Sequence, residues 1–138
     1  MASTIVECTD AFVTLASVDV ERLVKFYSHL FGKSPQNYMP NAYAEFNLPG
    51  LRLGIFQPRE THRQEFEAKG GSMSLCLEVR DLEEAILAVA QAGANAHLTA
   101  IGYSPPGEII VASHGREIYA YDPDGNRLIL HQSPGTDR

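Results

Sequence analysis

The chain has 138 residues, of which 44% are apolar, enough to bury one hydrophobic core, so we expect a single domain over residues 1–138. Its 11 Lys and Arg against 17 Asp and Glu give a formal net charge of −6, which repels nucleic-acid phosphates and anionic lipid heads. We therefore expect no nucleic-acid partner and no membrane partner. Two distant cysteines without a CxxC pattern are too few for a disulfide framework, which favours a cytoplasmic protein.

In chain order, hydrophobic periodicity first predicts a strand over residues 11–17 and a helix over 20–31. Three short strands follow, over residues 34–39, 42–47 and 51–56. The first half therefore has the order βαβββ, in a module that we place at about residues 10–57.

The polar, charged stretch that follows, residues 58–71, ends in two glycines and has the composition of a linker. The series then starts again in a second module, at about residues 72–133. The polar stretch GYSPPGE interrupts this module and is predicted to be a loop. The predicted elements are a strand over 72–79, a helix over 82–92, and strands over 95–101, 116–121 and 127–132.

The two halves also match in detail. LASVDVERL aligns without gaps to LEVRDLEEA, and Gly32 and Gly93 stand where the two helices should close. Asp19 and Asp81 stand where an N-cap carboxylate accepts the free N–H groups of the first helical turn. The sequence therefore predicts an α+β fold of two βαβββ modules.

Each predicted strand can be divided into two faces, because alternate residues of a strand point the same way. One face is apolar in every long strand, with Leu53 and Ile55 in the first module and Leu128 and Leu130 in the second. That face must pack against the helices.

The opposite face mixes aromatic and polar residues, which is typical of a ligand cleft. If the DPDGN turn pairs Tyr121 with Arg127, then Glu117 and Tyr119 also belong to this face. The residues that we expect to contact a ligand are Phe12, Thr14, Phe56, Ser74, Cys76, Tyr119, Tyr121, Ile129 and His131.

Three segments, FVTLASVDVERLVKFYSHLFG, SLCLEVRDLEEAILAVAQAGA and GREIYAYDPDGNRLIL, resemble the vicinal oxygen chelate superfamily. This superfamily includes glyoxalase I, extradiol dioxygenases, fosfomycin-resistance enzymes and bleomycin-resistance proteins. The resemblance implies that the two modules form an open, eight-stranded cup. It also implies a homodimer, and a divalent metal in the cup of those members that are enzymes.

Enzymes of this superfamily carry metal ligands, usually His, Glu or Gln, on the first and last strand of each module. These four positions correspond here to Phe12, Gly54, Ser74 and Ile129. A catalytic divalent cation needs three or more nitrogen or oxygen donors, and these residues offer only one hydroxyl. We therefore expect no metal at these positions and no cofactor.

His131 and Glu78 are the candidates for chemistry on the mixed face. His131 lies two residues beyond Ile129, so it is either a displaced ligand or base, or a residue that only lines the cup. Tyr119 matches a tyrosine that contacts substrate in fosfomycin-resistance enzymes, and it can equally be an aromatic wall. His114, beside a glycine, is expected on the surface.

These observations leave several functions open. We favour a binding protein that holds a small apolar or aromatic molecule, with a bleomycin-type drug-sequestering protein as a narrower version. The enzyme alternative is a metal-dependent glyoxalase-like lyase or a dioxygenase, with ligands displaced to Glu78, Glu117 and His131. The third alternative is a module that serves only for dimerisation or as a scaffold.

Overall fold

The computed structural model describes residues 5–67, 71–95 and 107–135. Within these residues it has eight strands, two α-helices and one 3₁₀ helix. No helix among them is long and apolar enough to span a membrane. The elements are β1 (Val13–Ala16), α1 (Val20–Phe31), β2 (Gln36–Met39), β3 (Tyr43–Leu48), β4 (Leu51–Phe56), η1 (Glu60–Phe66), β5 (Leu75–Glu78), α2 (Leu82–Asn95), β6 (Ile110–Ala112), β7 (Gly115–Tyr121) and β8 (Arg127–Gln132).

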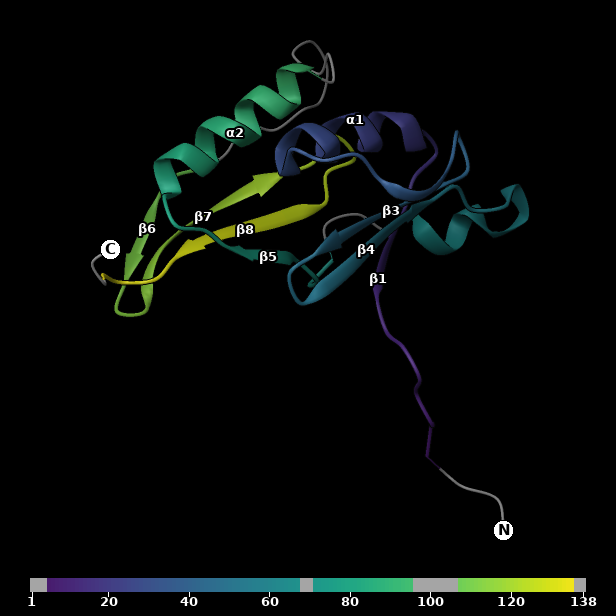
Figure 1. The fold of residues 1–138 in the computed structure, drawn as a ribbon, viewed down its shortest axis with the longest axis horizontal. Coiled ribbons are helices and arrows are strands. Elements are labelled where there is room, and N and C mark those ends of the chain that lie inside the picture. Colours follow the sequence, from purple (N-terminus) through teal and green to yellow (C-terminus); the bar gives the residue numbers. More distant parts are fainter. Residues whose placement is uncertain (1–4, 68–70, 96–106, 136–138) are drawn as a thin grey trace.

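The strands form two four-stranded sheets, in the orders β1-β4-β3-β2 and β5-β8-β7-β6. In each sheet the first strand of the module runs parallel to the last, and the other neighbours are antiparallel. The α+β fold of two βαβββ modules is thus confirmed. Figure 1 shows α1 and α2 on the same side of the two sheets.

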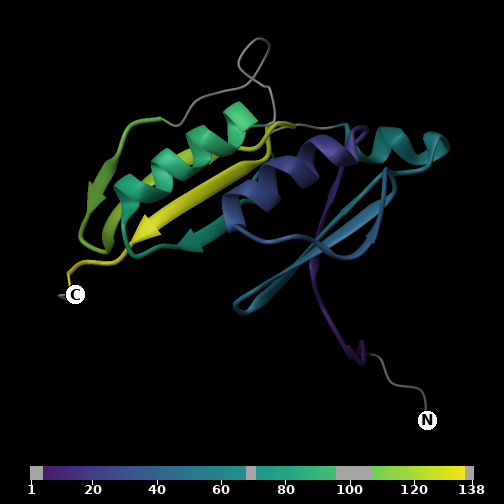
Figure 2. The ribbon, with the colours of Figure 1, turned by 45° about the horizontal axis from the view of Figure 1, so that its top comes forward.

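The core lies between the helices and the predicted apolar faces of the sheets. Leu53, Ile55, Leu128 and Leu130 are buried, as expected. α1 packs on β3 and β4, α2 packs on β7 and β8, and the two helices contact each other. Figure 2, turned by 45°, shows the same layer of helices over the sheets. The helices thus cover one face of each sheet and leave the other face for function.

Both predicted N-caps of the helices are present. The Asp19 carboxylate accepts the Arg22 N–H at 3.1 Å, and the Asp81 carboxylate accepts the Glu84 N–H at 3.0 Å. Gly32 closes α1 in the left-handed conformation, with φ +65°. Gly93, by contrast, is a buried residue within α2, so the expected end of this helix was wrong. A helical glycine costs only about 1 kcal/mol relative to alanine, which tertiary packing can offset.

The predicted strand over residues 95–101 was also wrong at its start, because Asn95 belongs to α2. The remainder, residues 96–101, lies outside the described residues. On the edge of β7 opposite β8, the strand that pairs with β7 is β6, with Ile110 opposite Glu117 and Ala112 opposite Gly115. Its sequence signal is the β-branched run Ile109, Ile110 and Val111, directly after the predicted polar loop.

The predicted linker, residues 58–71, contains the 3₁₀ helix η1. Phe66 at the end of η1 packs edge to face on Phe56 at the end of β4, with ring centroids 5.4 Å apart. Composition indicated only a polar connection. The aromatic pair gives it a folded turn against the first sheet.

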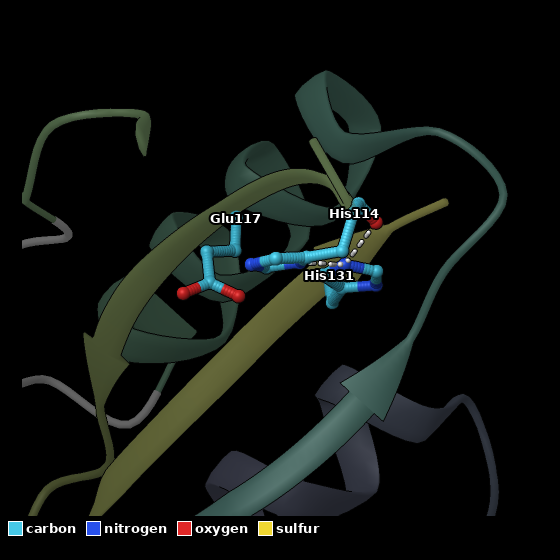
Figure 3. A group of neighbouring side chains, drawn as sticks. All are labelled: His114, Glu117 and His131. Carbon is cyan, nitrogen blue, oxygen red and sulfur yellow. Dashed lines mark hydrogen bonds between the residues drawn. The ribbon is translucent and has the colours of Figure 1, made fainter. Parts of the chain in front are cut away.

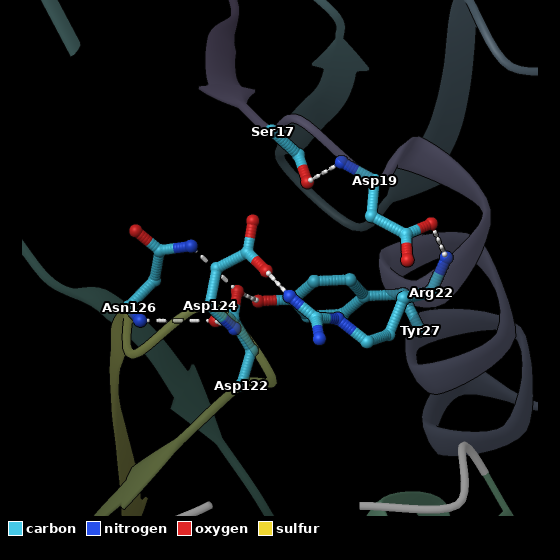
Figure 4. A network of polar contacts seen from close by, with 7 residues as sticks. All are labelled: Ser17, Asp19, Arg22, Tyr27, Asp122, Asp124 and Asn126. Carbon is cyan, nitrogen blue, oxygen red and sulfur yellow. Dashed lines mark hydrogen bonds and ion pairs between the residues drawn. The ribbon is translucent and has the colours of Figure 1, made fainter. Parts of the chain in front are cut away.

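The DPDGN turn between β7 and β8 docks on α1 of the other module (Figure 4). The Tyr27 hydroxyl donates to Asp122 at 2.6 Å, and Arg22 forms an ion pair with Asp124 at 2.9 Å. Asp122 is only 1% exposed, and it also accepts backbone N–H groups from Asp124 and Asn126 and the Asn126 side-chain amide. The turn is therefore part of the junction between the modules as well as a hairpin connection.

Candidate functional site

The site is built on the open faces of the two sheets, by which we mean the faces turned away from α1 and α2. In the second sheet Tyr121 pairs with Arg127, as expected, so Glu117 and Tyr119 lie on the same face as Tyr121. Tyr119 stands opposite Ile129 and is 39% exposed. Aromatic side chains are thus accessible on a face that no described helix covers.

Thr14 and Cys76 occupy matching places in the two modules. Thr14 is beside Gly54 in the parallel pair of the first sheet, and Cys76 is beside Ile129 in that of the second. Both side chains are exposed. Cys76 is a free thiol on β5, an edge strand of the second sheet.

Two of the four residues that the resemblance matches to metal positions of the superfamily lie in the first module. Phe12 precedes β1, is 43% exposed, and has the Arg52 guanidinium 4.5 Å above its ring centroid. At Gly54 an added Cβ would be 3.1 Å from the Tyr43 hydroxyl and 3.2 Å from the Thr14 methyl. Neither residue carries a donor atom for a metal, and the space over Gly54 is already taken by its neighbours.

The other two positions lie in the second module. The Ser74 hydroxyl accepts a hydrogen bond from Arg127 at 3.2 Å, and a cationic neighbour disfavours a metal cation there. Ile129 is flanked by Cys76 and Tyr119 and offers no donor. The residues at the four positions therefore do not fit the divalent metal that the superfamily's enzymes carry.

A polar cluster on the first open face was missed by sequence reasoning. Glu45 stands opposite Gly54, is 9% exposed, and accepts the Tyr43 hydroxyl at 2.7 Å and the Asn37 amide at 2.8 Å. Burial, then the bond to Glu45, raises the pKa of Tyr43 to about 12. The hydrogen bonds from Tyr43 and Asn37 lower the pKa of Glu45. The available sequence signal was the spacing of Tyr43 and Glu45, which are two residues apart on one strand and therefore share a face.

The structure brings together the two candidates for chemistry, Glu78 and His131. Nδ1 of His131 lies 2.7 Å from the Glu78 carboxylate, and the Ser133 N–H and hydroxyl donate to the other carboxylate oxygen at 2.9 and 2.7 Å. The Ser133 and His131 bonds lower the pKa of Glu78. The Glu78 bond raises the pKa of His131. Glu78 thus holds the ring of His131 in one orientation.

His114 and Glu117 complete a group around His131 (Figure 3). Nδ1 of His114 lies 3.1 Å from Nε2 of His131, and the two rings are stacked with centroids 5.2 Å apart. One ligand atom from each of the three residues lies within 4.8 Å of the others. His114 is exposed, as expected, but sequence reasoning missed its contact with His131 because β6 was not predicted.

Phe56 lies apart from these groups. Its ring packs on Phe66 and lines a shallow hollow of about 320 Å³ at the end of β4, together with Pro58, Arg59 and His62. This hollow is at the linker. Phe56 thus lies in the first module, apart from the residues of the second module that are expected to contact a ligand.

Comparisons with known proteins agree with this architecture. The family model of the Glyoxalase/Bleomycin resistance protein/Dioxygenase superfamily matches residues 10–130. A curated relative, metallothiol transferase FosB of Shouchella clausii, is 24% identical over 126 residues, which are 91% of this chain and 81% of that protein.

Solved structures show the same fold. A glyoxalase-related enzyme from Fulvimarina pelagi has a TM-score of 0.67 and 21% identity, covering 92% of this chain and 90% of its own. A bleomycin-binding protein in complex with bleomycin has a TM-score of 0.61 and 22% identity, covering 92% of this chain and 100% of its own. At these identities the likeness concerns the fold.

Proposed function

The chain belongs to the glyoxalase/bleomycin resistance protein/dioxygenase superfamily, and we propose that it binds a small, largely apolar or aromatic molecule on its open faces. In this proposal no metal occupies the superfamily's usual positions. The observation that carries it is the donor set: Phe12, Gly54, Ser74 and Ile129 supply one hydroxyl, which already accepts a hydrogen bond from Arg127.

The surroundings of these positions support an organic ligand. Phe12 and Tyr119 expose aromatic surface, while Thr14 and Cys76 are accessible beside them. Organic ligands are typically held by apolar walls with a few polar groups that set orientation. The Tyr119 hydroxyl can supply such a polar contact, because tyrosine offers an aromatic face and a hydrogen-bonding end together.

A narrower version is the sequestration of a bulky cationic drug such as bleomycin. Two of the structural neighbours are bleomycin-binding proteins, at 22% and 19% identity. The net charge of −6 favours a cationic ligand over an anionic one. Titration calorimetry with bleomycin tests this version, and an absence of heat at micromolar protein and drug would end it.

The proposal includes a homodimer. The open faces expose aromatic side chains, among them Phe12 and Tyr119, and an uncovered apolar surface of this kind favours a partner. Residues 5–9 also extend away from the sheets, with Ile5 and Val6 exposed (Figure 1). A second copy would cover the open faces and enclose the ligand.

The two free cysteines allow a direct test of the binding face. In a Cys8→Ser variant, only Cys76 reacts with a bulky fluorescein maleimide. In a Cys76→Ser variant, only Cys8 does, which gives a matched control. A panel of fluorinated aromatic compounds, screened by ¹⁹F NMR, should contain binders whose affinity falls at least tenfold when Cys76 is blocked. Labelling of Cys8 should leave these affinities unchanged.

The proposal would be wrong if no compound in the panel and no bleomycin bound. The proposed binding face would be wrong if compounds bound with the same affinity before and after labelling of Cys76.

A further inference from the structure

We propose that His114, Glu117 and His131 form a site for a divalent transition metal of the Zn²⁺ class on the second open face. This site differs from the superfamily's metal positions in its residues and its origin. All three ligands come from the second module: His114 from the β6–β7 turn, Glu117 from β7 and His131 from β8. The inference does not depend on the proposed small-molecule function.

The three ligand atoms converge without rearrangement of the backbone. They lie within 4.8 Å of one another, and the two imidazole nitrogens are 3.1 Å apart. Two ligands bound to zinc at about 2.0 to 2.1 Å in a tetrahedron are separated by roughly 3.3 Å. Small side-chain rotations therefore suffice to bring two nitrogens and one carboxylate oxygen to bonding distance.

Glu78 and Ser133 supply the support that metal-binding histidines usually have. An ionised carboxylate can only accept hydrogen bonds. The Nδ1–H of His131 therefore donates to Glu78, which leaves Nε2 for the metal. Glu78 is held in turn by two hydrogen bonds from Ser133. Glu78 is therefore a positioning residue, whereas sequence reasoning had considered it as a displaced ligand.

The contacts of Nε2 of His131 also indicate what a cation would replace. Nε2 of His131 faces both Nδ1 of His114, at 3.1 Å, and the His114 carbonyl oxygen, at 2.9 Å. The carbonyl oxygen can only accept, so its hydrogen bond with Nε2 requires a proton on Nε2. A divalent cation takes the place of that proton and binds Nε2 and Nδ1 together.

The donor set selects the metal class. Two imidazoles and a carboxylate suit Zn²⁺, Co²⁺, Ni²⁺ or Fe²⁺, whereas Mg²⁺ and Ca²⁺ prefer oxygen ligands throughout. With three protein ligands, a tetrahedral ion keeps one position for water or for an oxygen donor of a ligand. His114 is exposed, so that position is accessible from solvent.

Cobalt and zinc are the probes for the test. Chelator-treated protein should bind one Co²⁺ per chain, giving visible d–d absorption, and Zn²⁺ should displace the cobalt. In NMR spectra, Zn²⁺ should shift the ring signals of His114 and His131 while leaving those of His29 and His62 in place. His114→Ala and Glu117→Gln should each weaken zinc binding at least tenfold, and His131→Ala should abolish it.

Matched controls separate this site from others. His62→Ala removes an exposed histidine of η1 and should leave zinc affinity unchanged. Ser74→Ala removes the one hydroxyl at the superfamily's positions and should also leave it unchanged. Circular dichroism of each variant confirms the fold. Two outcomes overturn the proposal. One is a zinc stoichiometry that survives His114→Ala together with His131→Ala. The other is the absence of binding at 100 µM zinc, which would put Kd above about 10⁻⁴ M.

The role of Glu78 has its own readout. Glu78→Gln should keep one zinc per chain but weaken its affinity by about 10 to 100-fold, as is usual for the loss of an outer carboxylate partner. The ¹⁵N shifts of His131 should show Nδ1 protonated in the zinc-bound wild type and a mixture of tautomers in the zinc-bound variant. Unchanged affinity and an unchanged tautomer in Glu78→Gln would contradict the positioning role.

Discussion

Gly115 decides, at the scale of a single residue, how the β6–β7 turn meets β8. Its φ is +128°, and a Cβ at this position would lie 2.2 Å from the Gln132 carbonyl oxygen and 3.0 Å from Nε2 of His131. Only glycine allows this approach, which brings His114 against His131. The sequence shows a glycine after His114, but it does not show that the backbone of β8 lies close to this glycine.

We therefore predict that Gly115→Ala destabilises the protein and separates the rings of His114 and His131. The positive φ costs about 1 to 3 kcal/mol, and the clash with Gln132 adds to this. Urea denaturation measures the loss of stability, and NMR follows the ring signals of His114 and His131. Gly71→Ala is the control, because a Cβ there meets nothing within 4 Å. Equal stability of the two variants would contradict this explanation of Gly115.

At the scale of elements, α1 has local signals at both of its ends. Asp19 accepts the Arg22 N–H at its start, and Gly32 takes the left-handed conformation at its end. The buried face of the helix carries Leu23, Phe26 and Tyr27 at helical spacing. These signals agree with one another, which is why the bounds of α1 were predicted correctly.

Loss of the α1 cap should be measurable. Asp19→Ala removes the acceptor for the Arg22 N–H and should lower the free energy of unfolding by about 1 kcal/mol. Asp19→Asn keeps a side-chain oxygen and should remain within about 0.5 kcal/mol of the wild type. Thermal or urea unfolding compares the three proteins. A loss of the same size in Asp19→Asn would show that charge, and not capping, is responsible.

β6 is a strand that local sequence patterns did not predict. It has only three residues, and its pairing partner β7 supplies the register that defines it. A three-residue strand has too little periodicity to be recognised alone. Because the β6–β7 turn carries His114, the contact of His114 with His131 was not predicted either.

At the scale of the whole molecule, Asp122 links the two modules through Tyr27 of α1. Burial raises the pKa of Asp122 above its ordinary value of 3.8, while hydrogen bonds from Tyr27 and Asn126 act in the opposite direction. The native state therefore holds the Asp122 proton more tightly than the unfolded chain does. Its contribution to stability is fully present below pH 3.8 and is lost as pH rises through the native pKa.

Because the pKa of Asp122 is higher in the native state than in the unfolded chain, we predict a pH dependence of stability. As pH is lowered from 7 towards 4, the difference in unfolding free energy between the wild type and Asp122→Asn should shift in favour of the wild type. Urea denaturation of both proteins at several pH values gives this difference, in which other titrating groups largely cancel. A shift in favour of the variant would mean that the four hydrogen bonds to the carboxylate outweigh its burial.

The proposed homodimer belongs to the same scale. Light scattering coupled to size exclusion should give twice the chain mass at micromolar concentration. Phe12→Asp places a charge on the open face and should shift the equilibrium towards monomer. Leu87→Asp changes a 58% exposed residue on α2 and should leave it unchanged. A monomeric wild type at 100 µM would contradict the dimer.

The sequence by itself determined the two βαβββ modules, the buried faces of the strands, both N-caps and the bounds of β4 and β8. These features depend on periodicity and on residues close together in the chain, so a single sequence expresses them. The candidate site was accessible only in part: the pairing of Tyr121 with Arg127 placed Glu117, Tyr119 and His131 on one face in advance.

The tertiary structure alone decided which side chains meet across strands and modules. His114 joins His131, Glu45 stands opposite Gly54, and Asp122 accepts the hydroxyl of Tyr27, which is 95 residues away. Each contact depends on strand register or on module docking, which are set by the packing of the whole core and have no local signature. For that reason the sequence indicated an open binding face, whereas only the folded chain revealed the histidine and glutamate group on it.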